Sequence, residues 1–251
     1  MNNKIYKTKE FYLVNNSLTN KELASLAGCS ESTINRAKRE LELTFQMLKD
    51  PKWDYKKLLE ITPISMYWAG FLLADGCFSQ EARKVKLSIA SSIIDQEHIL
   101  KFKTWLNSDN IIYYTNDNCC SFSVYSKKHL PDIMKFWNFS YRKTYVPYEI
   151  PEHIFNNENF KYFIVGLIDG DGSVVTTGNT YKISITQHNC QHLFFEKLNT
   201  YLNNTNHKLY YSDKDNTVNL TIQKQELRDK IKSWYCELAD IPLNRKFNKM
   251  I

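Results

Sequence analysis

The chain has 251 residues and a formal net charge of +6, from 33 Lys and Arg against 27 Asp and Glu. Its 43% hydrophobic residues are enough for a folded core, which excludes an intrinsically disordered chain. No stretch approaches the ~18 continuous apolar residues of a membrane span, and the six cysteines include no Cys-x-x-Cys pair. We therefore expect a reduced, cytoplasmic protein without a membrane segment, and the mild positive charge suits a polyanionic partner.

The first predicted elements are two short helices between Thr19 and Arg39, joined by a tight turn at Gly28. Thr19 followed by Glu22 predicts a capping box, and Ser30 predicts the cap of the second helix. The apolar residues expected to pack between the helices are Leu23, Leu26, Ala27, Ile34 and Ala37. This pattern predicts a DNA-binding helix-turn-helix over residues 1–45, with an ordinary αα-hairpin as the alternative. Residues that would then reach DNA are Ser32, Thr33, Asn35, Arg36 and Arg39.

Residues 46–62 are predicted to form a helical linker, and beyond them the sequence repeats itself with an offset of about 96 residues. The apolar segment Trp68–Gly76 aligns with Ile164–Gly172, and both end in Asp-Gly. Further matches follow in the same order: Val85–Ala90 with Tyr181–Thr186, Tyr113 with Tyr210, Leu130 with Leu227 and Trp137 with Trp234. We infer a tandem duplication, with repeats at 63–155 and 156–251.

Each repeat has the predicted order α-β-β-α-β-β-α. After the Asp-Gly, alternation places Val85, Leu87 and Ile89 on one strand face and Lys86, Ser88 and Ala90 on the other. The next helix is predicted to bury Ile94, His98, Phe102 and Trp105, and strands near 111–114 and 121–126 precede a last helix near 130–137. The fold class is therefore α+β, with helices on one face of an antiparallel sheet and two such units forming a saddle with a polar underside.

The two Asp-Gly segments carry the predicted chemistry. Small residues such as Gly70 and Gly166 let two helices approach closely, which would bring Asp75 and Asp171 together. Adjacent carboxylates repel unless cations intervene, and a hard divalent metal such as Mg²⁺ takes oxygen ligands and activates phosphodiester cleavage. The alternative is that both residues only end helices.

These motifs resemble those of the LAGLIDADG homing endonucleases in their single-chain, two-repeat form, over about residues 63–251. The second motif matches closely, whereas the first departs at its start and has Leu73 where the family often has Asp. The resemblance implies two αββαββα repeats forming a pseudo-twofold saddle. It also implies a monomer that makes a double-strand break in a long, near-asymmetric double-stranded DNA target with Mg²⁺; Mn²⁺ would substitute, and Ca²⁺ would bind without supporting cleavage.

Site residues follow from the same resemblance. It implies metal binding by Asp75 and Asp171 and by the carbonyl groups of Ala74 and Gly170, and catalytic roles for both carboxylates. Lys143 and Lys246 are the expected catalytic lysines, with a solvated basic surface as their alternative. A polar residue on each second strand is also expected near the scissile phosphates, and the candidates are Ser88 or Ser91 and Ser184 or Gln187.

Base recognition is expected from the polar strand faces, since antiparallel ribbons fit the major groove. Alternation nominates Ser79, Glu81, Arg83, Lys86, Ser88, Ser121, Ser123 and Tyr125 in the first repeat. The second repeat contributes Val175, Thr177, Asn179, Lys182, Ser184, Asn219, Thr221 and Gln223. Gln187, as a candidate near the scissile phosphates, is also expected to contact DNA. The alternative function is a non-cleaving protein on the same scaffold, either a maturase bound to intron RNA or a transcription regulator. Both motif aspartates are present, which favours the nuclease.

Overall fold

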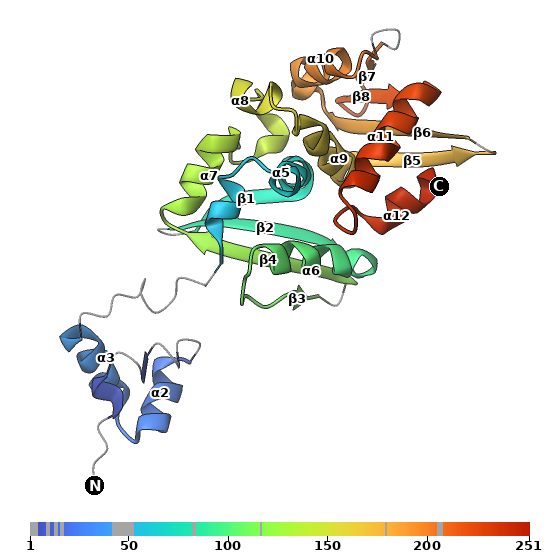
Figure 1. Ribbon diagram of the computed structural model, residues 1–251. Coiled ribbons are helices and arrows are strands. Elements are labelled where there is room, and N and C mark those ends of the chain that lie inside the picture. Colours follow the sequence, from blue (N-terminus) through green and yellow to red (C-terminus); the bar gives the residue numbers. More distant parts are fainter. Residues whose placement is uncertain are drawn as a thin grey trace. The chain divides into compact units, whose positions relative to one another are not determined.

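The computed structural model describes residues 5–8, 11–12, 15, 18–41, 53–81, 84–115, 117–178, 180–204 and 208–251. The chain divides into two compact units, Met1–Pro51 and Lys52–Ile251 (Figure 1). No helix in the described part of the chain has the length and apolar character that a membrane crossing requires.

The N-terminal unit contains the 3₁₀ turn η1 (Ile5–Lys7) and the helices α2 (Asn20–Ala27) and α3 (Glu31–Glu40). The predicted capping box forms: the Glu22 amide donates to the Thr19 side chain, and the Glu22 carboxylate accepts from the Thr19 amide. Gly28 ends α2 with φ 62°, a conformation that glycine adopts without strain. The prediction that Leu26 packs between the helices is wrong, because its side chain is 54% exposed.

The second unit contains the two predicted repeats. The first comprises α5 (Pro63–Asp75), β1 (Gly76–Glu81), β2 (Lys84–Ser92), η3 (Ile93–Asp95), α6 (Gln96–Trp105), β3 (Tyr113–Tyr114), β4 (Cys119–Ser126) and α7 (His129–Trp137). The second comprises α9 (Phe160–Asp171), β5 (Gly172–Thr177), β6 (Thr180–His188), η5 (Asn189–Gln191), α10 (His192–Tyr201), β7 (Tyr210–Ser212), β8 (Thr217–Ile222) and α11 (Gln225–Glu237). This order confirms the α+β fold with two αββαββα repeats.

Shorter elements complete the second unit. They are η2 (Tyr55–Leu58), η4 (Lys143–Tyr145), α8 (Glu152–Phe155), α12 (Asn244–Phe247) and η6 (Asn248–Met250). η2 belongs to the first repeat, because Leu58 is fully buried and its carbonyl accepts a 2.6 Å hydrogen bond from Trp137 Nε1. The predicted linker therefore differs from the structure at its C-terminal end: 53–62 belongs to the second unit, while 42–52 lies outside the described residues.

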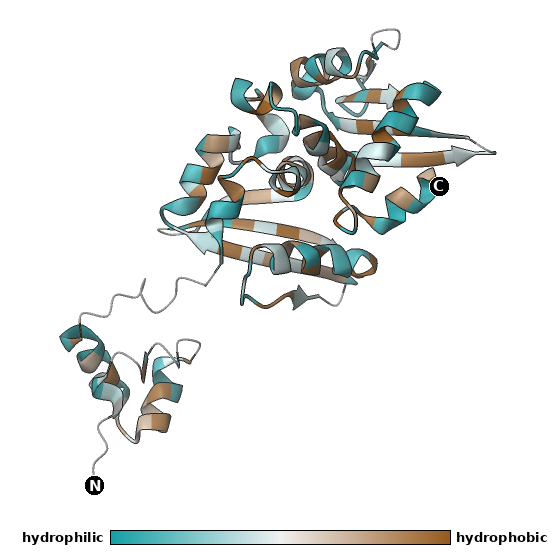
Figure 2. Cartoon of the chain, viewed as in Figure 1, coloured by the Kyte–Doolittle hydropathy of each residue, from teal (hydrophilic) through white to brown (hydrophobic). Residues whose placement is uncertain are grey.

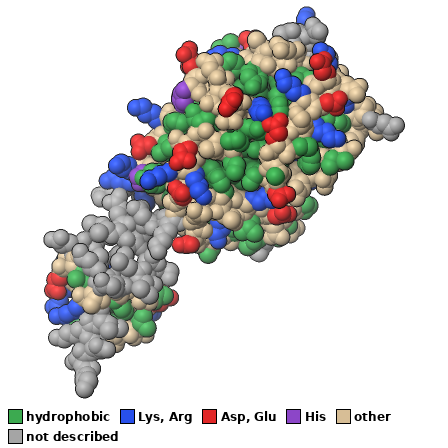
Figure 3. All heavy atoms as spheres, in the orientation of Figure 1, with side chains coloured by type: hydrophobic (Ala, Val, Ile, Leu, Met, Phe, Trp, Pro, Cys, Tyr) green, Lys and Arg blue, Asp and Glu red, His purple; other side chains and the backbone are tan. Residues whose placement is uncertain are grey.

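Each repeat folds into a four-stranded antiparallel sheet, in the order β1-β2-β4-β3 and β5-β6-β8-β7. Hydrophobic and hydrophilic residues alternate along the strands, as the bands of Figure 2 show. Val85, Leu87 and Ile89 face the core, as predicted, and Ile183 and Ile185 do the same in the second sheet. In the view of Figure 3, acidic and basic side chains of the second unit are interspersed, so the net charge gives no single-sign patch there.

Helices α5 and α9 pack against each other through glycine. A Cβ atom added to Gly70 would lie 1.9 Å from the carbonyl oxygen of Phe163, and one added to Gly166 would lie 1.9 Å from that of Tyr67. Backbone therefore meets backbone at two equivalent points, as the small-residue pattern predicts. These two helices lie at the centre of the core, with an almost entirely buried α5.

One predicted detail of the first repeat is wrong, and one strand is shorter than predicted. Ile94 lies in η3, ahead of α6, and its side chain is 79% exposed, so it does not share the buried face of His98 and Phe102. The outer strand β3 is limited to Tyr113 and Tyr114, and Ile111 precedes it with an exposed side chain. Both differences arise because a hydrophobic pattern can extend beyond the backbone hydrogen bonds that define an element.

Candidate active site

The two motif aspartates are the last residues of their helices. Asp75 ends α5 and Asp171 ends α9, and the following glycines, Gly76 and Gly172, are extended and begin strands β1 and β5. The helix ends touch, since a Cβ on Gly170 would lie 2.2 Å from Ala74 Cβ and 3.5 Å from Asp75 Oδ2. The structure therefore brings the two predicted carboxylates to one place.

Electrostatics of this pair favour a positively charged ligand. Desolvation raises the pKa of Asp75, and the neighbouring charge of Asp171 raises it further. Desolvation also raises the pKa of Asp171, although a hydrogen bond from Gln187 opposes that shift. Two partly desolvated carboxylates with raised pKa values are stabilised by cations placed beside them.

Lys143 and Lys246 supply such cations from within the chain. The Lys143 ammonium donates to the carbonyl oxygen of Leu72 at 3.0 Å and also to those of Leu73 and Ala74. The Lys246 ammonium donates to the carbonyl oxygens of Ile168, Asp169 and Gly170 at 3.0, 2.5 and 3.0 Å. Each lysine thus binds the C-terminal carbonyl groups of its own motif helix, where the helix dipole favours a cation.

These contacts argue against a merely solvated basic surface. Lys246 is buried, and desolvation lowers its pKa. Desolvation likewise lowers the pKa of Lys143, to about 8. The carbonyl groups predicted to bind metal, those of Ala74 and Gly170, accept hydrogen bonds from the two lysines.

The donor set is compatible with a hard divalent cation. Asp75, Asp171 and the carbonyl groups of Ala74 and Gly170 offer only oxygen, which Mg²⁺ prefers, and carbonyl oxygens have a second lone pair. No cluster of three or more His, Cys, Asp or Glu that could hold a metal occurs among the described residues. The protein oxygens would therefore need water and phosphate oxygens to complete the coordination, as is common for Mg²⁺ at nucleotide phosphates.

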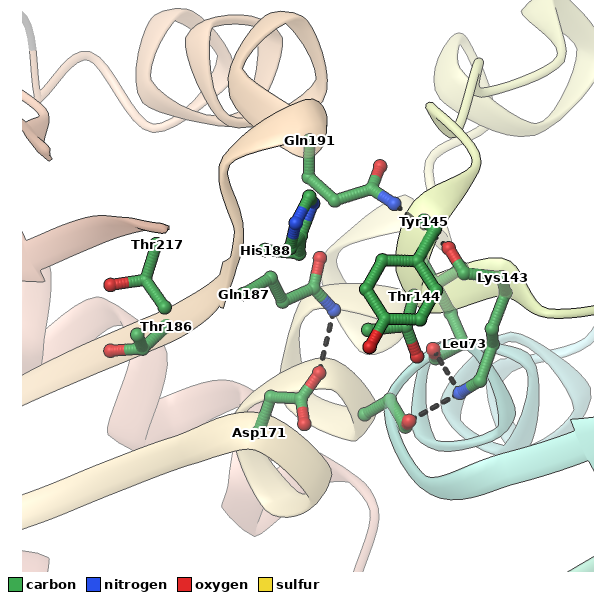
Figure 4. A pocket seen from close by; sticks show the side chains of 11 residues that line it. Leu73, Lys143, Thr144, Tyr145, Asp171, Thr186, Gln187, His188, Gln191 and Thr217 are labelled. Carbon is green, nitrogen blue, oxygen red and sulfur yellow. Dashed lines mark hydrogen bonds between the residues drawn. The ribbon is translucent and has the colours of Figure 1, made fainter. Parts of the chain in front are cut away.

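A cavity of about 340 Å³ lies beside Asp171, between β6 and the segment that carries Lys143 (Figure 4). Gln187 projects into it from β6, and its Nε2 donates to Asp171 Oδ2 at 2.6 Å. Of the two second-strand candidates in this repeat, Gln187 is therefore the one that contacts the motif carboxylate. The equivalent residue in the first repeat is Ser91, whose side chain is shorter.

The nominated residues of the first sheet share one face. Register pairs Ser79 with Lys86 and Ser88 with Ser123, and side chains paired across antiparallel strands point the same way. Tyr125 and Ser121 complete this face, opposite Lys86 and Ala90. Arg83 and the side chain of Glu81 lie outside the described residues.

In the second sheet, Val175, Thr177, Lys182, Ser184, Asn219 and Thr221 share the equivalent face. Its polar groups are connected: Asn219 Nδ2 donates to Thr186 Oγ1 at 2.5 Å, and Thr221 Oγ1 donates to Asn219 Oδ1 at 2.7 Å. Gln187 lies on the opposite face, toward Asp171, so it does not share the polar face, and its nomination near the scissile phosphates stays a prediction. Gln223 lies just after β8, and Asn179 lies outside the described residues.

In the N-terminal unit, the nominated residues contact one another or their neighbours along α3, and Asn35 also contacts α2. Ser30 caps α3 and contacts the side chains of Ser32 and Thr33. Asn35 accepts from Asn20 of α2 at 2.8 Å. Arg36 lies 3.7 Å from Glu40, and Arg39 donates to the Asn35 carbonyl, so both arginines stay at the exposed surface of α3.

Sequence reasoning missed two kinds of residue. Tyr113 and Tyr210 are exposed and pair with Ser121 and Asn219, which places them at the outer edge of the polar faces. Their equivalent positions in the two repeats were the available signal. The contacts of Asp169 and Gln191, described below, depend on residues far away in the chain and had no such signal.

Comparison with known proteins identifies the fold. No family model matches the sequence, and no curated protein matches it. Among solved structures, I-SmaMI, a LAGLIDADG homing endonuclease bound to cleaved DNA, has 14% identity and a TM-score of 0.54, over 76% of this chain and 87% of that one. The LAGLIDADG homing endonuclease I-GzeII, in complex with its DNA target, has 15% identity and a TM-score of 0.52, over 76% and 88%. The LAGLIDADG meganuclease I-CpaMI, bound to uncleaved DNA, has 13% identity and a TM-score of 0.52, over 75% and 88%.

Proposed function

The second unit has the two-repeat fold of single-chain LAGLIDADG homing endonucleases, and we propose that the chain is such an enzyme. In this proposal it makes a metal-dependent double-strand break at a specific, long DNA site, and it is intron-encoded or free-standing. The observation that carries the proposal is the pairing of Asp75 and Asp171 at touching helix ends, with a lysine beside each. The fold neighbours in complex with DNA support the same substrate.

Each site residue then has a role. Asp75, Asp171 and the carbonyl groups of Ala74 and Gly170 would hold Mg²⁺, which would supply Lewis acidity toward phosphate oxygens. Mn²⁺ would substitute for it, and Ca²⁺ would bind without supporting cleavage. Lys143 and Lys246 stabilise the negative charge that develops on the scissile phosphates. Gln187 holds the Asp171 carboxylate in one orientation through its 2.6 Å hydrogen bond.

Sequence recognition is assigned to the polar sheet faces. The hydrogen bonds among Thr186, Asn219 and Thr221 fix these side chains before DNA arrives, which lowers the entropy lost on binding. The two faces carry different residues, so the proposed target has unlike halves.

The experiment that tests this function uses Asp75→Asn and Asp171→Asn. The substrate is DNA spanning the gene's insertion site with the insert removed, or a site selected by cleavage from a random library. Wild type should cut in Mg²⁺ and stop in EDTA, whereas both variants should lose at least about 10³-fold in rate and still bind. The exposed Asp109→Asn variant is the matched control. Wild-type cutting rates in both motif variants would contradict the mechanism.

We also propose that α3 of the N-terminal unit contacts the same DNA. The exposed side chains of Arg36 and Arg39 suit phosphate contacts. Each change to alanine should weaken binding about fivefold at moderate salt and reduce its salt dependence. Lys21→Ala, on α2, is the matched control. Unchanged DNA affinity in both arginine variants would contradict this proposal and would favour the alternative, an ordinary αα-hairpin.

A further inference from the structure

Each active-site lysine is carried by a segment that is bound to the opposite repeat. Lys143 follows α7 of the first repeat, yet its segment, residues 142–148, contacts η5 and α10 of the second. Lys246 lies in α12 at the end of the second repeat, yet its neighbour Arg245 contacts η3 of the first. The lysine-bearing segment of each repeat thus has contacts with the other repeat as well as with its own.

Gln191 holds the first of these segments. Its Nε2 donates to the carbonyl oxygens of Lys143 at 3.1 Å and Val146 at 2.8 Å, and its Oε1 accepts from the Tyr148 amide at 2.8 Å. The Gln191 side chain therefore satisfies three backbone groups around Lys143 while it is only 5% exposed. A buried amide with all these partners fixes the backbone in one position.

Neighbouring contacts point the same way. Cys190 Sγ lies 3.3 Å from the Thr144 carbonyl oxygen, and the ring of Tyr145 meets His188 edge-on at 5.1 Å. Gln191, Cys190 and His188 all lie at the end of β6 or in η5, so a single turn of the second repeat binds the Lys143 segment.

Asp95 holds the second segment. Arg245 Nε and Nη2 donate to the two carboxylate oxygens of Asp95 at 3.2 and 2.9 Å, a bidentate pair that fixes orientation. Lys101 of α6 also lies 3.5 Å from the Pro242 carbonyl oxygen. Asp95 ends η3 as Gln191 ends η5, and the two positions are equivalent in the duplication.

We propose that Gln191 and Asp95 are positioning residues, each acting across the repeat boundary: Gln191 places Lys143, and Asp95 places Lys246 through Arg245. At these equivalent positions, an amide in one repeat and an ion pair in the other both hold a lysine-bearing segment. Each lysine therefore reaches its carbonyl groups only while both repeats are docked. The catalytic consequence rests on the proposed function, but the placement of the lysines does not.

The first test needs no DNA. Full-length protein is treated with a lysine-acetylating reagent, and the rates at Lys143 and Lys246 are followed by mass spectrometry. Gln191→Ala should raise the rate at Lys143 about tenfold and leave Lys246 unchanged, because two or more hydrogen bonds to its segment are lost. Asp95→Ala should raise the acetylation rate at Lys246 roughly threefold and leave Lys143 unchanged. The effect is smaller because Lys246 keeps its other contacts.

Two further variants protect the test against loss of the fold. Gln191→Glu keeps the size but removes both amide donors, and Arg245→Ala changes a half-exposed side chain outside the core. Exposed Glu196→Gln is the control for removal of a carboxylate, and thermal unfolding is measured for every variant. Equal acceleration at both lysines, or none in variants that fold normally, would overturn the proposal.

The second test is strand-resolved cleavage of a doubly end-labelled target. Gln191→Ala should slow cutting of one strand about tenfold, and Asp95→Ala should slow the other strand, so nicked intermediates of opposite polarity accumulate. A general loss of structure slows both strands alike and would count against the positioning role. If wild type cuts no DNA at all, the proposed function fails, and the acetylation rates still decide how the lysines are placed.

Discussion

Leu73 and Asp169 occupy equivalent positions in the two motif helices, and only the second carries a charge. Asp169 is buried and accepts hydrogen bonds from Tyr67 at 2.6 Å, Tyr235 at 2.8 Å and the Leu243 amide at 2.7 Å. Burial raises its pKa to about 6. The first repeat has no such network at Leu73, which packs in the apolar core.

This difference shows how a duplicated unit can diverge without losing symmetry at its reactive end. Tyr67 comes from the first repeat and Asp169 from the second, so the buried network also ties the halves together. It holds Leu243, three residues before Lys246, whereas the Lys143 segment is held by Gln191. Lysine placement is the same in both repeats, although the contacts behind it differ.

The largest expected effect comes from the feature that the repeats share. Gly70→Ala and Gly166→Ala should each reduce the free energy of unfolding by about 3 kcal/mol, because the new Cβ would meet a backbone carbonyl that cannot move aside. Gly178→Ala, at φ 58° with open space around it, should cost only about 1 kcal/mol. Urea unfolding measures all three. Equal losses of unfolding free energy in the three glycine variants would contradict backbone contact between α5 and α9.

The next effect tests the asymmetric network. Asp169→Leu, which copies the first repeat, should cost about 2 kcal/mol of unfolding free energy, because three buried donors lose their acceptor while the desolvation of a carboxylate is relieved. Adding Tyr67→Phe and Tyr235→Phe should recover part of that loss. Denaturant unfolding of the single, double and triple variants checks this. A triple variant that is no more stable than Asp169→Leu would contradict the assignment.

A smaller effect is expected on the cleavage rate, because Gln187 contacts Asp171 and the first repeat has only the shorter Ser91 at the equivalent position. Gln187→Ala should slow cleavage about tenfold, or about 1.4 kcal/mol in activation free energy, because the Asp171 carboxylate loses its orienting donor. Ser91→Ala at the equivalent position should have little effect. Single-turnover rates under saturating protein make the comparison. Equal rate losses in the two variants would mean that the repeats do not differ here.

The smallest expected effect is the part of the pH dependence of stability that His98 of the first repeat contributes. Burial lowers the pKa of His98 to about 3, and its Nδ1 lacks a hydrogen-bond partner. The unfolded chain therefore binds this proton between pH 6.5 and 3, and stability falls as pH falls through that window. Phe194 occupies the equivalent position in the second repeat, so phenylalanine is a suitable replacement. Between pH 7 and 5.5, the loss of unfolding free energy should be about 1 kcal/mol smaller in His98→Phe than in wild type. Unfolding at pH 8, where His98 is neutral in both states, gives the packing cost alone; an unchanged loss on acidification would refute the assignment.

Local and repeated signals made much of the fold predictable. The capping box at Thr19, the helix ends at Gly76 and Gly172, and the alternation of Val85, Leu87 and Ile89 depend on near neighbours in the chain. The duplication added the pairing of Asp75 with Asp171, because two copies of one motif predict two copies of one environment. The predictions that Ile94 and Leu26 are buried were wrong, because an apolar residue at the right spacing can still lie beyond the packed surface.

The sequence by itself therefore predicted the two repeats, the α+β class and the two aspartates that the structure brings together, whereas the two lysines were expected only from the resemblance. Only the tertiary structure decided that Gln187 faces Asp171 and not the polar sheet surface, and that each lysine segment is bound by the opposite repeat. Strand pairing fixes the direction of every side chain at once, and Asp95 lies 150 residues from Arg245. Contacts of that separation are set by how the whole chain packs, which no local pattern of residues records.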